Sequence, residues 1–300
     1  MKMRDNHKKD RTMPEKLSGI APELLKKAVE KLKHARPAYA DMLGFYEKLF
    51  MAQEQSISAV RIGSILLPQD LITLKKHEKM PLISKNDFLI DANLSRSLFD
   101  EIWEMAANPE NGLPAFVSAG KRDIPKPNPD DLFSALLNED REVFEKTGQE
   151  MGMTPQIPEF LAFSSLVPCL RVCSHQLSVY TDPDNWEAGY CPICGSMPSL
   201  SVLREKGDRY MICGFCRKEW AVSRFLCFTC NAADAKHHQY FYTDEEKEYR
   251  VDVCDHCGTY MKTVDIRKMD RFFYPPLEEI VTLHLDMNAQ EKGYHSLLAL

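Results

Sequence analysis

The sequence has no uninterrupted apolar run near the roughly 18 residues that a membrane span requires, and residues 1–16 lack the apolar core of a secretory signal. It also has no excess of basic residues, since 38 Lys and Arg stand against 44 Asp and Glu, a formal net charge of -6. A general nucleic-acid binder needs a concentrated surplus of Lys and Arg to contact phosphates. We therefore expect a soluble, cytoplasmic protein with no membrane insertion and no nucleic-acid partner.

Catalytic signatures are missing as well. Carboxylates are plentiful, but none occurs in a setting such as His-Glu-x-x-His. The cysteines also lack the strand-then-helix surroundings of a thioredoxin-like dithiol. The sequence therefore predicts no enzyme and no catalytic residue.

Cysteine, by contrast, is abundant: there are ten, and eight of them form four Cys-x-x-Cys pairs in the last third of the chain. Each pair, which we call a knuckle, places two thiolates on one side of a tight turn, half of the tetrahedral shell that Zn or rubredoxin-type Fe prefers. Because the chain is long and its cysteines are vicinal pairs, we expect two metal ions rather than disulfides. The predicted metal ligands are Cys191, Cys194, Cys213, Cys216, Cys227, Cys230, Cys254 and Cys257.

The first 180 residues have mainly helical apolar spacing. The prolines in residues 120–129 indicate a stiff connector between helices. We predict helices from Pro22 to the stop at Pro37, from Tyr39 towards Ile57 or Ile62, from an N-cap at Asp91 to the break at Asn108, from Asp130 to Lys146 and from Pro158 to about Gln176.

After Asp182 short β-rich runs replace the long amphipathic ones. Turn-forming residues separate the runs 199–203 and 209–212, and again 239–242 and 249–253, which predicts two hairpins. Strands at 220–225 and 261–266 would close the two units, so that knuckle, hairpin, knuckle and strand occur twice. A final helix is expected from Leu277 to about Met287.

These elements predict an α+β protein. An N-terminal all-α helical domain, residues 1–183, is followed by two tandem rubredoxin-like (zinc-ribbon-like) four-Cys units, residues 184–225 and 226–300. The second unit includes the C-terminal helix, which we expect to pack back on the metal units.

The knuckles can pair in two ways. If neighbours pair, 18 residues (195–212) separate the inner cysteines of the first site and 23 residues (231–253) those of the second, and each hairpin closes its own loop. Interleaved pairing, first knuckle with third and second with fourth, is the alternative. Either way four protein ligands leave no open position, which favours structural metal or electron transfer over hydrolysis.

The residue after each knuckle is expected to turn through positive φ, so that backbone N–H groups can point at sulfur. Gly195 and Gly258 suit this conformation, Asn231 tolerates it, and Arg217 is the least comfortable. Five basic residues either offset the negative charge of a four-thiolate site or are ordinary solvated charges: Arg204, Arg209, Arg217, Lys218 and Arg224.

Other conspicuous residues are given structural roles. We expect Cys169 and Cys173 to pack in the core, and the tryptophans to pack in the core or between domains. The histidines near the knuckles are expected to be exposed or hydrogen-bonded rather than ligands, because eight thiols are already available. These residues are Trp103, Trp186, Trp220, His237, His238 and His256.

The four-knuckle block resembles the FdhE family of formate dehydrogenase accessory proteins. The resemblance lies in Cys-Pro-Ile-Cys-Gly-Ser at 191–196, Arg-Tyr-Met-Ile-Cys-Gly-Phe-Cys at 209–216, Cys-Phe-Thr-Cys at 227–230 and Cys-Asp-His-Cys-Gly-Thr-Tyr at 254–260, with Trp220 and Arg224 between them. It covers about residues 189 to 295, whereas the first 180 residues are similar only as a helical region. It implies a cytoplasmic assembly factor with two rubredoxin-like sites on the same eight cysteines, iron being favoured over zinc.

The resemblance also implies the partner, the catalytic subunit of a molybdenum- or tungsten-dependent formate dehydrogenase. Our hypothesis is therefore a maturation factor that holds this subunit until its cofactors are in place. One alternative is a rubredoxin-like electron carrier or redox partner. A second is a zinc-ribbon nucleic-acid module, against which the acidic tip of the second hairpin argues: Asp244, Glu245, Glu246 and Glu248.

Overall fold

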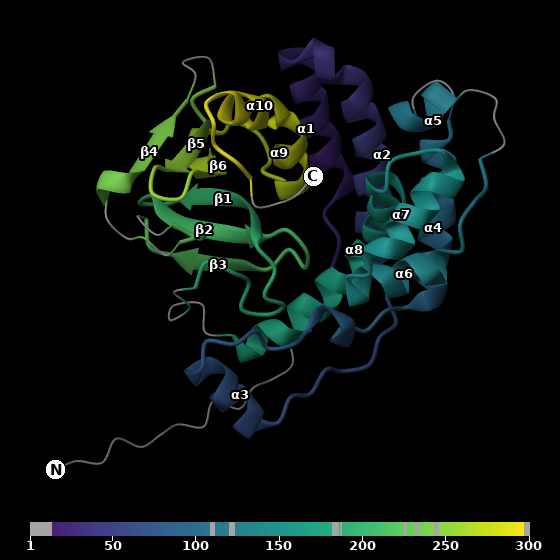
Figure 1. The fold of residues 1–300 in the computed structure, drawn as a ribbon, viewed down its shortest axis with the longest axis horizontal. Coiled ribbons are helices and arrows are strands. Elements are labelled where there is room, and N and C mark those ends of the chain that lie inside the picture. Colours follow the sequence, from purple (N-terminus) through teal and green to yellow (C-terminus); the bar gives the residue numbers. More distant parts are fainter. Residues whose placement is uncertain are drawn as a thin grey trace.

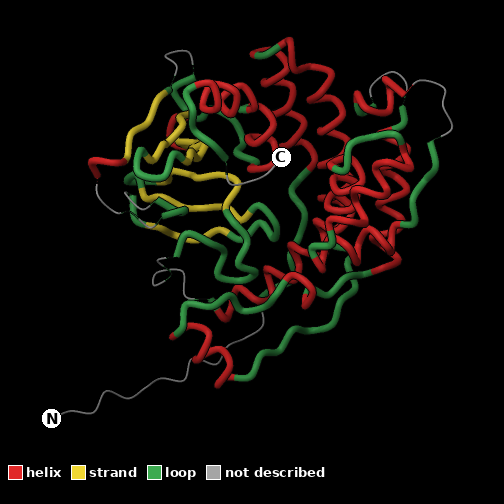
Figure 2. Tube along the Cα trace, in the orientation of Figure 1, coloured by secondary structure: helices red, strands yellow, loops and turns green. Residues whose placement is uncertain are grey.

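Helices and sheet form two parts that lie side by side (Figure 1). The computed structural model describes residues 14–108, 112–119, 124–181, 186, 188–224, 227–230, 232, 235–242 and 246–296. Figure 2 shows the strands gathered on one side and most helices on the other. The α+β class predicted from the sequence, with a helical N-terminal part and a four-knuckle sheet, is confirmed.

The helical part is built around α8, which packs against α2, α4, α6 and α7. Its 18-residue apolar window meets the length and composition of a membrane span, but 67% of that window is buried inside the protein, as in a core helix. The helices are α1 (Pro22–Ala35), α2 (Ala40–Ile57), α3 (Gln69–His77), α4 (Ala92–Ala106), α5 (Pro114–Ala119), α6 (Pro129–Asn138), α7 (Arg141–Met151) and α8 (Gln156–Leu177).

Most of these helices follow the predicted spacing. The predicted cap at Asp91 is confirmed, because its carboxylate accepts a hydrogen bond from the backbone N–H of Leu94 at 3.1 Å. The single helix predicted from Asp130 to Lys146 is wrong: Glu139 has a φ of 57° and ends α6, and Asp140 caps α7. α3 and α5 were not predicted.

A proline inside α8 explains one buried polar contact. Pro168 has no backbone N–H, so the carbonyl of Ser164, four residues earlier, has no helical donor. The side chain of Gln53, which is 4% exposed, donates to this carbonyl from α2 at 2.8 Å. The interruption in α8 therefore becomes a hydrogen bond that ties two core helices together.

The two repeat units share one six-stranded sheet of order β3-β2-β1-β6-β5-β4. Both predicted hairpins form, β1 with β2 and β4 with β5, and β3 and β6 close the two units. The units join through parallel pairing of β1 with β6, in which Val202 lies opposite Val264. The strands are β1 (Pro198–Arg204), β2 (Asp208–Cys213), β3 (Glu219–Val222), β4 (His238–Phe241), β5 (Tyr249–Cys254) and β6 (Thr259–Asp265).

The predicted C-terminal helix is two helices, α9 (Pro275–Val281) and α10 (Leu283–Glu291). The chain bends at Thr282, whose hydroxyl donates to the carbonyl of Glu278 at 2.6 Å and so competes with the helical backbone. Both helices pack on the sheet, as expected, α9 on β1 and α10 on β5 and β6. The prediction was therefore wrong about the length of the C-terminal helix and right that this segment packs on the sheet.

The helical part and the sheet share one continuous hydrophobic core. Glu54 of α2, 4% exposed, strengthens the junction, because its carboxylate accepts hydrogen bonds from the backbone N–H of Ile20 at 3.0 Å, from Tyr274 at 2.8 Å and from Arg171. The division into domains 1–183, 184–225 and 226–300 stays a prediction, since residues 183–184 and 225–226 lie outside the described residues.

Candidate metal centres

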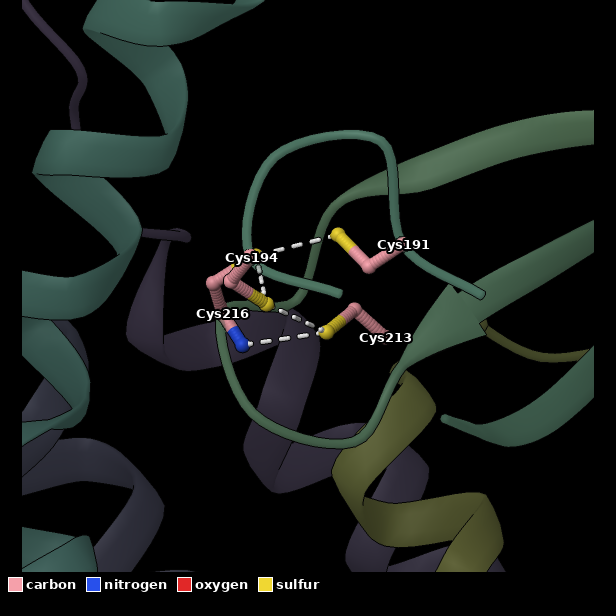
Figure 3. A group of neighbouring side chains, drawn as sticks. All are labelled: Cys191, Cys194, Cys213 and Cys216. Atoms are coloured by element: carbon pink, nitrogen blue, oxygen red, sulfur yellow. Dashed lines mark hydrogen bonds between the residues drawn. The ribbon is translucent and has the colours of Figure 1, made fainter. Parts of the chain in front are cut away.

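The first cluster consists of Cys191, Cys194, Cys213 and Cys216, whose Sγ atoms all lie within 4.8 Å of one another (Figure 3). Three of the sulfur–sulfur distances are 3.6 Å (191–216), 3.5 Å (194–213) and 3.7 Å (194–216). A tetrahedral ion with metal–sulfur bonds of about 2.3 Å requires sulfur–sulfur edges of about 3.8 Å. No disulfide links the described cysteines, so four free thiols with tetrahedral spacing fit one metal ion.

Backbone groups of the knuckles are directed at these sulfurs. The N–H of Ile193 lies 3.4 Å from Cys191 Sγ, and the N–H groups of Phe215 and Cys216 each lie 3.3 Å from Cys213 Sγ. The predicted positive φ is present after both knuckles, 75° at Gly195 and 61° at Arg217. The local chain geometry is thus that of a metal-binding turn.

The first cluster is enclosed by the helical part. The backbone N–H groups of Leu82 and Ile83 donate to the carbonyls of Pro192 and Ile193 at 3.0 and 2.9 Å, so the segment after α3 pairs with the first knuckle. On the second knuckle, Phe215 packs edge-on against Phe88 and at a tilt against Phe163 of α8. All four cysteines are buried as a result.

The second cluster consists of Cys227, Cys230, Cys254 and Cys257, and its sulfurs also all lie within 4.8 Å of one another. The 227–257 and 230–254 distances are 3.6 and 3.8 Å, and Gly258 has a φ of 72°. Cys230 and Cys257 are partly exposed. The structure therefore brings together the sequential sets and not the interleaved ones, and it gives the second set contact with solvent.

The thiols within each cluster differ in pKa. Burial raises the pKa of Cys191 and Cys216, whereas hydrogen bonds from the neighbouring thiols lower the pKa of Cys194. Burial likewise raises the pKa of Cys254 to about 12. At Cys227 burial also raises the pKa, but hydrogen bonds from backbone N–H groups and from neighbouring thiols together outweigh it, and the pKa falls to about 7. A divalent cation is the group that would let all four sulfurs of a site ionise together.

The five basic residues near the sites differ in their partners. Three are occupied by local partners: Arg204 pairs with Glu219, Arg217 with Glu279, and Arg224 donates to the carbonyl of Lys206. The two others, Arg209 and Lys218, also interact with cluster thiols, although Arg209 pairs with Asp252 as well. Burial lowers the pKa of Lys218 while Cys191 and Cys216 raise it, and burial lowers the pKa of Arg209 while Asp252 and Cys227 raise it.

The core packing expected for Cys169, Cys173, Trp103 and Trp220 is confirmed. Cys169 and Cys173 are buried, and Cys173 donates to the carbonyl of Leu89 at 3.2 Å; burial raises the pKa of this thiol to about 12. His238 bonds the carbonyl of Ala232, while His237 and His256 face each other with ring centroids 5.6 Å apart. Trp103 and Trp220 are buried, and Trp186 packs on Tyr190.

Two predictions concern residues outside the described ones: the conformation of Asn231, and the acidic residues Asp244 and Glu245 of the second hairpin tip. Within the described part of that tip, Glu246 pairs with Arg36 and with His284, the latter at 2.8 Å. This acidic residue therefore contacts the residue that follows α1 and the first turn of α10.

Sequence reasoning missed two features of the sites. Ser196 lies 3.4 Å from Cys194 Sγ, and Thr259 lies 3.0 Å from Cys257 Sγ. The repeated pattern Cys-Gly-Ser or Cys-Gly-Thr was a signal for these hydroxyls. No local signal marked Leu82 and Ile83, which reach the first knuckle from more than 100 residues away.

Residues 190–224 match the central domain of FdhE. An FdhE homologue from Aquifex aeolicus is 31% identical over 149 residues, which is 48% of this chain and 52% of that protein. FdhE of Escherichia coli O9:H4 (strain HS) is 34% identical over 108 residues, 35% of this chain and 34% of that one. The chain is similar in sequence to FdhE proteins over part of its length. It thus spans about half the length of the first relative and about a third of the second.

The crystal structure of the FdhE protein from Pseudomonas aeruginosa has the same fold. The TM-score is 0.55 at 20% sequence identity, with 95% of this chain and 96% of that chain covered. The likeness therefore extends the FdhE resemblance from the four-knuckle block to the helical part, as a likeness of fold alone.

Proposed function

We propose that this chain is a non-enzymatic assembly factor for a molybdenum- or tungsten-dependent formate dehydrogenase. In this proposal it acts in the cytoplasm, where it binds the catalytic subunit before that subunit is complete. The supporting observation is the pair of four-cysteine clusters with tetrahedral spacing in an FdhE-type fold. Because four sulfurs complete each shell, neither cluster leaves a position at which a substrate could be activated.

The eight cysteines would hold two metal ions in this proposal. Each ion would supply positive charge that keeps four thiolates together and fixes the two knuckles of its unit. The sulfur spacing suits zinc and rubredoxin-type iron alike, and the family resemblance favours iron. Elemental analysis of protein produced with both metals supplied, together with the thiolate-to-iron absorption in the visible spectrum, decides between them.

Co-purification tests the proposed partner. The tagged chain is expected to recover the formate dehydrogenase catalytic subunit from its native host, and more of it when molybdenum-cofactor synthesis is blocked. A matched control is the catalytic subunit of another molybdoenzyme from the same host. Repeated recovery of no formate dehydrogenase subunit, from a preparation with both clusters loaded, would refute the proposal.

An electron carrier is the second candidate, and the partial exposure of Cys230 and Cys257 favours it. A carrier must present its metal site close to the surface, which only the second cluster does. Protein loaded with zinc alone cannot transfer electrons. If zinc-loaded protein restores formate dehydrogenase formation in a deletion host, the carrier function is eliminated.

A further inference from the structure

We propose that His237 and His256 form a metal-entry site, at which their imidazoles bind a divalent transition-metal ion at the surface and pass it to the second cluster. The surface site depends only on the two histidines. The hand-over rests on the proposed function, because it requires that the second cluster holds a metal ion.

The chain brings the two imidazoles together at one knuckle. His256 lies between Cys254 and Cys257, and His237 ends the short 3-10 turn η4 (Ala235–His237) that leads into β4. The backbone N–H of Asp255 donates to the carbonyl of His237 at 2.9 Å, which holds this turn against the knuckle. The centroids of the two rings then lie 5.6 Å apart.

This separation suits one shared ion. A zinc ion bonded to an imidazole nitrogen at about 2.1 Å lies about 3.2 Å from the ring centre, so two rings that share it at a tetrahedral angle have centres about 5.2 Å apart. The planes of His237 and His256 are tilted by 63° and are not stacked. Because the His256 side chain is exposed, its ring can turn a nitrogen toward the shared point. Imidazole is a ligand that suits zinc and iron alike.

The nitrogens of these two rings are available. Among the residues that the structure describes, neither ring takes part in a hydrogen bond or an ion pair. Other histidines differ, since a ring nitrogen of His175, His238 and His284 lies 2.7, 3.0 and 2.8 Å from an oxygen acceptor. Hydrogen bonding therefore accounts for those three histidines and leaves the pair without such a role.

The pair lies next to the accessible sulfurs. His256 directly precedes Cys257, which is partly exposed, as is Cys230. Two imidazoles leave the other positions of the ion to water, so they hold it less tightly than four thiolates do. In the hand-over each new metal–sulfur bond replaces a metal–nitrogen or metal–water bond, and the thiol proton passes to solvent.

The first cluster provides an internal reference. Its knuckles read Cys-Pro-Ile-Cys and Cys-Gly-Phe-Cys and carry no histidine. Its four cysteines are buried, and Leu82 and Ile83 pair with one of its knuckles. Loss of the histidine pair should therefore change the metal exchange of the second cluster and leave that of the first cluster unchanged.

The first experiment asks whether the pair binds an ion. Full-length protein with zinc in both clusters is titrated with further Zn²⁺ by calorimetry, and the NMR signals of the histidine rings identify the ligands. We expect a single further ion that shifts the signals of His237 and His256. His237→Phe and His256→Phe keep a ring and remove its nitrogens, and each should weaken this binding about tenfold or more.

A histidine elsewhere gives the matched control. His77 ends α3 and its side chain is 82% exposed, so His77→Phe should leave the binding of the further Zn²⁺ unchanged. The unfolding midpoint identifies a variant that has failed to fold, and His237→Gln/His256→Gln then takes the place of the phenylalanine variants.

The second experiment measures the hand-over. Cd²⁺ is added to the zinc-loaded protein, and its entry into the clusters is followed through the thiolate-to-cadmium absorption. We expect His237→Phe/His256→Phe to slow entry into the second cluster about tenfold or more, with an unchanged rate at the first cluster and an unchanged final cadmium content. A folded double variant that takes up cadmium at the original rate at both clusters would overturn the hand-over.

Failure of this site and failure of the proposed function give different results. If the histidines bind added Zn²⁺ while the second cluster holds no metal ion, the proposed metal centre and the hand-over are overturned and the surface site is supported. If the second cluster is filled and no further Zn²⁺ binds, or if both phenylalanine variants bind it as the unaltered protein does, the metal-entry site is overturned.

Discussion

The two four-cysteine clusters have the same motif and the same sulfur spacing, yet they occupy different surroundings. The first is buried where the sheet meets the helical part, with Leu82 and Ile83 paired to its knuckle. The second lies at the far end of the sheet, beside the edge strand β4, with two sulfurs partly exposed. Equal local chemistry therefore gives one site that joins the two parts of the protein and one that faces outward.

The largest expected effect comes from two single variants, each of which removes one metal ligand from a different cluster. We predict that Cys213→Ser lowers the free energy of unfolding by on the order of 5 kcal/mol, because metal binding is part of folding, and that protection is lost in both parts of the protein. Cys254→Ser should cost less and act on the second unit alone. Hydrogen exchange at Leu82 and Ile83, compared with Val251 and Val253, measures the difference. Loss of hydrogen-exchange protection at the same residues in both variants would contradict this prediction.

Two matched phenylalanines sharpen the comparison at the knuckles. Phe215 and Phe228 are each 7% exposed, but Phe215 packs on two aromatic rings of the helical part, Phe88 and Phe163. We predict that Phe215→Ala costs about 3–4 kcal/mol through the cavity it leaves, and Phe228→Ala about half of that. Denaturant unfolding monitored by tryptophan fluorescence tests this. Equal costs would show that contact with the helical part adds nothing at the first cluster.

The two clusters should release their metal ions at different rates. Because Cys230 and Cys257 are partly exposed, a chelator reaches the second metal without opening the core. We predict two phases whose rates differ at least tenfold, a gap of about 1.4 kcal/mol in opening free energy. Alkylation followed by mass spectrometry assigns the phases, with Cys230 and Cys257 modified in the fast one. Single-phase release would indicate equally accessible sites.

The smallest expected difference is between the stability costs of alanine at Gly195 and at Gly258, the glycines that directly follow a knuckle. Both have positive φ, so an alanine is strained at either position. An added Cβ at Gly195 would lie 2.9 Å from Pro81 Cγ, in a rigid ring of the helical part, whereas at Gly258 it would meet the movable ring of His295 at 3.2 Å.

We predict costs of about 2–3 kcal/mol for Gly195→Ala and about 1–2 kcal/mol for Gly258→Ala. Thermal unfolding measures both. Gly63→Ala is the control, since no atom lies within 4 Å of its added Cβ. A larger loss at Gly258 would reverse the comparison.

Much of the sheet followed from local signals. The turn residues between β1 and β2 and between β4 and β5 predicted both hairpins. The knuckle spacing was compatible with sequential pairing, in which each hairpin returns the chain to its own first knuckle, and the structure brings those sets together. Periodicity placed α1, α2, α4 and α8. It failed at Glu139 and Thr282, where single residues interrupt an otherwise continuous helical pattern. A 3.6-residue period does not report such breaks.

By itself the sequence determined the eight thiols and the two hairpins that carry them, since these depend on residues near in the chain, whereas the structure decided that neighbouring knuckles pair. Only the tertiary structure decided that β1 and β6 join the units in parallel and that Leu82 and Ile83 cover one knuckle. It also decided which cluster faces solvent. These outcomes depend on packing between segments far apart in the sequence, for which spacing and composition carry no signal.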